Sequence, residues 1–193
     1  KRGQQTETDG GWGWGWGWCM RVAGTHTDLS PRCGAQVLLA DEATRRFVSP
    51  PNAFLSHAWQ YRFKDVVEAL EAFGGTEEGE EVFFWFDCFS IDEHATQTQP
   101  PEWWSTAFKG CVAHIGHTVM LLAPWAKPIP LTRSWCLWEL FCTVDVGAEF
   151  SVCLSPAEAR AFKAALREDS GVFLDALAHI DVAHAEAGSA ADQ

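Results

Sequence analysis

The glutamate at position 139 is the residue whose surroundings point most strongly to chemistry. It lies in the run WCLWEL, residues 135–140, among tryptophan, leucine and cysteine side chains. A glutamate on a solvated helix surface needs no explanation, but an unpaired carboxylate is costly to bury. In such apolar company Glu139 is therefore either paired with another group or placed for a function.

Polar and aromatic residues also close the first two apolar runs after residue 52. Ser56 and Trp59 stand at the end of the first run, and Phe86 and Asp87 at the end of the second. A serine there can hold a ligand or only satisfy backbone groups at a strand end, and an aspartate can equally be a turn residue that hydrogen-bonds the backbone. Both Ser56 and Asp87 therefore have a structural interpretation as well as a functional one.

Strand-like and helix-like segments alternate around these candidates. Continuous apolar runs occupy residues 53–56, 82–86, 118–123 and 150–154. Such runs are typical of strands buried on both faces, which occur in parallel sheets covered by helices. Between them apolar residues recur at helical spacing, as at Phe63, Val66 and Leu70. The alternation predicts an α/β fold.

We expect a flavodoxin-like three-layer sandwich, with a central parallel sheet of four or five strands flanked by helices and a strand order of 2-1-3-4. In open sheets of this kind, ligands bind beyond the carboxyl ends of the strands, near the point where the strand order reverses. That rule directs attention to residues 56–61, 87–94 and 124–139. Ser56, Asp87 and Glu139 fall within these segments.

Residues 1–52 differ in composition from the rest of the chain. Residues 10–18 read GGWGWGWGW. Glycine at alternate positions removes packing atoms and raises backbone entropy, so the run makes a poor core strand. We expect 1–52 to be a low-complexity, poorly ordered segment with at most one short strand at 36–40. Two prolines at 50–51 mark its end, and 53–193 form the folded domain.

The charge and cysteine content narrow the possible partners. The 193 residues carry 14 basic and 26 acidic side chains, a net charge of −12, which argues against nucleic-acid binding. Seven cysteines without a C-x-x-C pair are typical of reduced thiols inside cells. No apolar run reaches the ~18 residues of a transmembrane helix. We expect a soluble, cytoplasmic protein with neither a nucleic-acid nor a membrane partner.

One set of residues has the spacing of a metal site. Cys111, His114 and His117 stand three apart, so on one helix they could face together. His117, however, begins the predicted third strand, and a fourth ligand is not nearby. We therefore expect no metal site.

Three of these segments resemble boxes of the TIR (Toll/interleukin receptor) domain, most closely of the plant type. They are FLS at 54–56 on the first strand, WFD at 85–87 after the second, and SWCLWEL at 134–140 on the third helix. Each box alone is weak, but the three occur in the right order and structural context. The resemblance covers residues 53–154.

Many TIR domains cleave NAD+ at the nicotinamide ribosyl bond through the glutamate of the third-helix box, which is Glu139 here. The resemblance thus implies an NAD+ nucleosidase in signalling or defence, activated by self-association, with NAD+ as substrate and no cofactor. A carboxylate beside the ribose stabilises an oxocarbenium-like transition state. By the same resemblance the nucleotide pocket is lined by Ser56, Trp59, Phe86, Asp87 and Trp135.

Two other functions remain open. One is a non-catalytic TIR interaction or adaptor module, which would bind further copies or other TIR domains through residues 88–101 and its helical faces. The other is a different flavodoxin-like nucleotide enzyme, such as a nucleoside ribosyltransferase. The intact box around Glu139 favours the NAD+-cleaving enzyme, whereas His57, Ala58 and the proline-rich loop at 125–130 depart from the usual pattern.

Overall fold

The computed structural model describes residues 33–74, 82–91 and 101–172, together with residues 174, 178, 185 and 186. Within them the strands are β1 (Ala53–Ser56), β2 (Phe84–Trp85), β3 (His117–Leu121) and β4 (Glu149–Cys153). They form one parallel sheet in the order β2-β1-β3-β4. The predicted strand positions and strand order are confirmed.

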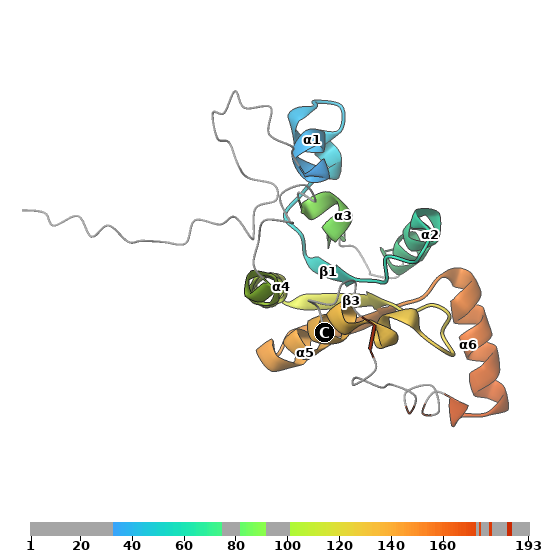
Figure 1. Cartoon of the computed structure of the whole chain (residues 1–193). Helices are drawn as coiled ribbons and strands as arrows, with labels where there is room; N and C mark the ends of the chain where they lie inside the picture. The colour runs from blue at the N-terminus through green and yellow to red at the C-terminus, as the bar shows by residue number, and fades with distance from the viewer. Residues whose placement is uncertain are drawn as a thin grey trace, which may run out of the picture.

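Helices cover both faces of this sheet. In the described residues they are α1 (Gly34–Ala40), α2 (Phe63–Gly74), α3 (Asp87–Ser90), α4 (Pro101–Ile115), α5 (Ser134–Val146) and α6 (Pro156–Glu168), with 3-10 turns η1 (Arg45–Phe47) and η3 (Ile129–Thr132). Helices α4 and α5 lie on one face and α2 and α6 on the other, which is the expected three-layer sandwich (Figure 1). No helix in this part of the chain has the length and apolarity needed to cross a bilayer.

The alternation of side chains along β1 decides which layer each residue meets. All four residues of β1 are buried. Ala53 and Leu55 pack with apolar residues of α2, while Phe54 packs with residues of α4 and α5. Because successive side chains of a strand point to opposite faces, Ser56 points to the same side as Phe54. The sheet therefore directs the Ser56 hydroxyl toward the layer that contains Glu139.

The segment before β1 contains a helix where the sequence analysis expected a strand. Residues 34–40 form α1, so the prediction of a short strand at 36–40 is wrong. Its alanine, leucine and glutamine residues have high helix propensity, and a short apolar run does not distinguish a strand from a helix. Helix α1 packs against α3 (Figure 1), where Gly34 lies against Phe89. The Gly-Trp run lies outside the described residues.

Candidate active site

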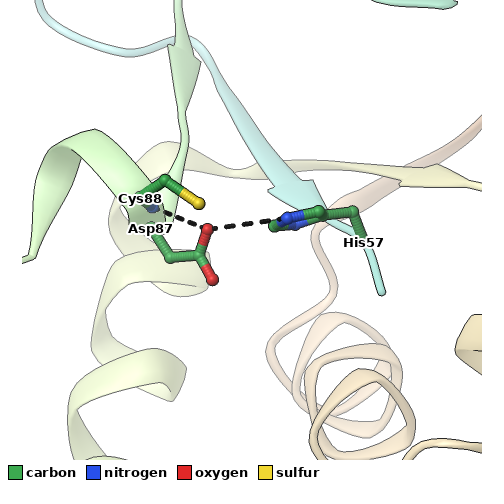
Figure 2. A group of neighbouring side chains, drawn as sticks. All are labelled: His57, Asp87 and Cys88. Atoms are coloured by element: carbon green, nitrogen blue, oxygen red, sulfur yellow. Dashed lines mark hydrogen bonds and ion pairs between the residues drawn. The ribbon is translucent and has the colours of Figure 1, made fainter. Parts of the chain in front are cut away.

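The loop after β1 and the first residues after β2 meet at Asp87. Oδ2 of Asp87 accepts a hydrogen bond of 2.5 Å from Nε1 of Trp59, and Oδ1 accepts one of 2.7 Å from the backbone N–H of Cys88. The same Oδ1 lies 3.8 Å from Nε2 of His57 (Figure 2). These residues meet because β1 and β2 are neighbouring parallel strands, whose carboxyl ends lie at the same edge of the sheet.

His57 is buried beside Asp87 and supported by Phe86. The phenyl ring of Phe86 packs edge-to-face on the imidazole, with centroids 4.8 Å apart and an interplanar angle of 87°. Burial lowers the pKa of His57, and the neighbouring Asp87 carboxylate opposes that shift only in part. The imidazole is therefore mainly neutral at pH 7, so its contact with Asp87 is not an ion pair there.

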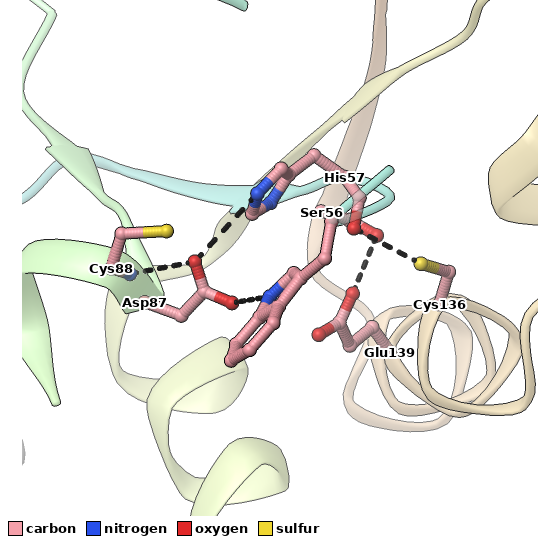
Figure 3. A network of polar contacts seen from close by, with 7 residues as sticks. Ser56, His57, Asp87, Cys88, Cys136 and Glu139 are labelled. Atoms are coloured by element: carbon pink, nitrogen blue, oxygen red, sulfur yellow. Dashed lines mark hydrogen bonds and ion pairs between the residues drawn. The ribbon is translucent and has the colours of Figure 1, made fainter. Parts of the chain in front are cut away.

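Ser56 and Glu139 meet on the opposite side of β1 from α2. The Ser56 hydroxyl donates a hydrogen bond of 2.5 Å to Oε2 of Glu139, across 83 positions of the sequence (Figure 3). Ser56 is 0% exposed and Glu139 is 8% exposed. The carboxylate that the sequence analysis expected to be paired or functional is thus paired with a hydroxyl, which carries no charge to neutralise it.

Hydrogen bonds fasten the inner face of α5 to the sheet around Glu139. One turn after Glu139, Oγ1 of Thr143 lies 2.8 Å from Oγ1 of Thr118 on β3 and 2.7 Å from the carbonyl oxygen of Glu139. One turn before it, the Cys136 thiol donates to the carbonyl oxygen of His57 at 3.3 Å. Glu139 is therefore held on a helix that is fixed to both β1 and β3.

Burial has a large effect on the acidity of Glu139. Loss of solvation raises its pKa to about 8. The hydrogen bond from Ser56 lowers the pKa in part, and the negative charge of Asp87 raises it further. The ligand-free protein thus holds a largely protonated Glu139 at pH 7. A positively charged group placed beside the carboxyl would favour its ionised form.

The other predicted site residues occupy different positions around Asp87 and Glu139. The Trp59 side chain is 67% exposed, so its ring offers a face to a ligand while its N–H binds Asp87. Phe86 is buried beneath His57 and also packs on Phe89. Trp135 lies one turn before Glu139 on α5, and its ring packs on Phe108 of α4 with centroids 5.6 Å apart.

The sequence analysis did not select His57 or Cys88 as site residues, although each directly follows or closely follows a predicted strand. Together with Asp87 they place one possible ligand atom each within 4.8 Å of one another. The residues Cys111, His114 and His117, which the sequence analysis considered as metal ligands, lie elsewhere. Cys111 is buried against the sheet, and Nε2 of His117 is hydrogen-bonded to Ser151 at 2.9 Å.

This edge of the sheet combines a protonatable carboxyl, a hydroxyl and an exposed indole ring. Such groups suit a ligand with hydroxyls and an aromatic ring, since the carboxyl can bind the hydroxyls or a developing positive charge and the indole can stack. Comparisons with protein-family models, with curated proteins and with solved structures found no match for this chain.

Proposed function

We propose that this chain is a TIR-type NAD+ nucleosidase in which Glu139 is the catalytic residue. The observation that carries the proposal is the burial of Glu139 against Ser56 at the carboxyl edge of a parallel sheet, where α/β proteins bind their ligands. The three TIR-like boxes supply the substrate, NAD+.

The reaction breaks the bond between C1′ of the ribose and N1 of nicotinamide. The electron pair of that bond leaves with nicotinamide, which becomes neutral and needs no strong acid. The ribosyl group becomes oxocarbenium-like, and water then adds to C1′ and releases a proton, which gives ADP-ribose. An ionised Glu139 stabilises the positive charge on the ribosyl group, and it does so strongly because the residue is only 8% exposed.

The raised pKa of Glu139 fits this chemistry through the charge of the substrate. The pKa is about 8 in the free protein, so most molecules carry a protonated carboxyl at pH 7. The nicotinamide ring of NAD+ is a cation, and a cation beside the carboxyl lowers its pKa. Substrate binding thus favours the catalytically useful carboxylate.

Ser56 and Trp59 have positioning and binding roles in this proposal. The Ser56 hydroxyl holds Oε2 of Glu139, which leaves Oε1 to face the ribose. The exposed indole of Trp59 stacks on adenine or nicotinamide, while its hydrogen bond to Asp87 fixes the ring orientation. Activation by self-association is part of the proposal because of the resemblance to TIR domains.

A non-catalytic interaction or adaptor module is the second candidate. It is favoured by the outer face of α5, where Phe141 is 52% and Val144 is 74% exposed. Exposed apolar residues that lie together on a helix suit binding of another copy or another TIR domain. In such a module Glu139 would have no catalytic role.

The test is release of nicotinamide from NAD+, followed by chromatography, with the purified chain tethered to promote assembly. Wild type is compared with Glu139→Ala and with the control Glu149→Ala, which removes an exposed glutamate from β4. Release that is lost in Glu139→Ala and kept in Glu149→Ala supports the enzyme. Absence of release from folded wild type in every assembled form supports the interaction module, and transfer of the ribosyl group to a nucleobase identifies a ribosyltransferase.

A further inference from the structure

We propose that His57, Asp87 and Cys88 form a binding site for a divalent transition-metal ion of the zinc type. The three residues offer one nitrogen, one oxygen and one sulfur ligand, all within 4.8 Å of one another. Nitrogen and sulfur donors select zinc and similar metals, whereas calcium and magnesium take oxygen ligands. The proposal concerns metal binding and does not depend on NAD+ cleavage.

The distances fit a tetrahedral ion after a small movement. With metal–ligand bonds of about 2.0–2.3 Å, neighbouring ligand atoms in a tetrahedral site are about 3.3–3.6 Å apart. Nε2 of His57 and Oδ1 of Asp87 are already 3.8 Å apart. The Cys88 sulfur lies toward the same space as these two atoms (Figure 2). No pair of ligand atoms is more than 4.8 Å apart, so each pair must approach by at most about 1.5 Å to reach tetrahedral spacing.

Two of the three ligands are held in place by their neighbours. The imidazole of His57 is buried and packs edge-to-face on Phe86. The Asp87 carboxylate is oriented by the Trp59 N–H, which binds Oδ2 at 2.5 Å, and by the backbone N–H of Cys88, which binds Oδ1 at 2.7 Å on the side near His57. Metal sites commonly use such hydrogen bonds to orient a ligating carboxylate.

Cys88 gives the site its access to solvent. It is exposed, whereas the other described cysteines are buried. Three protein ligands leave a fourth tetrahedral position for water or another group, as in zinc sites that exchange ligands. The ion would lie between the ends of β1 and β2, next to the strand end that presents Ser56.

The test uses the full, reduced, metal-free chain and Co²⁺ as a spectroscopic probe. At this site the chain binds one equivalent of Co²⁺, which shows the visible bands of a tetrahedral ion and a near-ultraviolet thiolate band. Addition of Zn²⁺ displaces the Co²⁺ and removes both sets of bands. Cys88→Ser removes the thiolate band, and both Cys88→Ser and His57→Ala weaken Zn²⁺ binding by about 100-fold or more. Trp59→Phe removes the orienting N–H and keeps an aromatic ring, so it weakens binding by about 10- to 100-fold.

The controls remove the same residue types elsewhere. His114→Ala replaces an exposed histidine of α4, and Cys19→Ser replaces a cysteine outside the described residues. Both keep wild-type binding. Because Cys88 is exposed, Cys88→Ser remains a fair test even if His57→Ala does not fold. Equal Zn²⁺ affinity in Cys88→Ser and wild type, loss of binding in either control, or no Co²⁺ bands with folded, reduced protein would overturn the proposal.

Discussion

The Glu139 carboxyl and the Ser56 hydroxyl form a buried hydrogen bond in which neither partner supplies a positive charge. The pKa of Glu139 rises from its ordinary value of 4.5 to about 8, chiefly because the group is removed from water. The folded protein therefore keeps a proton that the unfolded chain releases between these two pH values. This difference links the stability of the fold to pH.

The first prediction concerns that link. Because the folded state holds the extra proton, the free energy of unfolding contributed by Glu139 falls as pH rises from about 5 to 8, by up to about 1.4 kcal/mol per pH unit. Glu139→Gln cannot ionise, so it loses this slope and becomes more stable than wild type at pH 8. Urea unfolding at several pH values measures the effect.

Other titratable groups near Glu139 do not affect the comparison of wild type with Glu139→Gln. His57, Asp87 and Cys136 lie around it, and the lowered pKa of His57 gives a slope of opposite sign, since stability then rises with pH. These groups are present in both wild type and Glu139→Gln, so the difference between the two reports on Glu139. Parallel pH profiles would contradict the prediction.

The second prediction concerns Ser56→Ala. The change removes the hydrogen bond that lowers the pKa of Glu139, so this pKa rises further. It also leaves a buried carboxyl without its hydroxyl partner, which costs about 1–3 kcal/mol of stability. NMR titration of the glutamate carboxyl carbons and urea unfolding measure the two effects. Ser151→Ala, which removes a hydrogen bond to His117 instead, should leave the pKa of Glu139 unchanged.

The third prediction concerns the threonine pair that joins α5 to β3. Thr118→Val removes one of the two partners of the buried Thr143 hydroxyl, which keeps its hydrogen bond to the carbonyl oxygen of Glu139, so the change costs about 0.5–1.5 kcal/mol. Replacing both residues by valine removes donor and acceptor together, so the double variant is more stable than the sum of the single changes predicts. A double-mutant cycle by chemical unfolding measures this coupling. Strict additivity would show that the pair does not act as a unit.

The fourth prediction concerns Trp59 and rests on the proposed activity. Loss of a stacked base weakens binding by about 1–3 kcal/mol, so Trp59→Ala raises the KM for NAD+ by roughly 5- to 150-fold. The side chain is 67% exposed, so the change has little effect on stability. Trp59→Phe keeps a ring and should recover most of the affinity. An unchanged KM in Trp59→Ala would exclude stacking on this ring.

The positions of β1, β2 and β3 followed from the sequence because each is largely apolar, whereas β4 (EFSVC) alternates and is mostly exposed; the strand order followed from the expected flavodoxin-like fold. The region of the site followed from the same pattern, since parallel strands bring their carboxyl ends to one edge. The helix at 34–40 did not follow, because a short apolar run has too few residues to reveal its period.

The individual contacts of the site depend on geometry that the sequence does not display. Ser56 meets Glu139 because of the alternation along β1 and the rotation of α5 about its axis, neither of which appears in a list of residues. Likewise His57 and Cys88 each look unremarkable beside their own strands. They become neighbours only because β1 and β2 are paired.

The separation of the bonded residues along the chain also governs how the site forms. The hydrogen bonds of Ser56 to Glu139, Cys136 to His57, and Trp59 to Asp87 span 83, 79 and 28 positions. Contacts of such long range form late in folding, once the chain entropy of closing the intervening loops has been overcome. A fragment that contains only one side of these contacts cannot form the site. The buried contacts of Ser56 and Cys136 break when α5 separates from the sheet, so they report global rather than local unfolding.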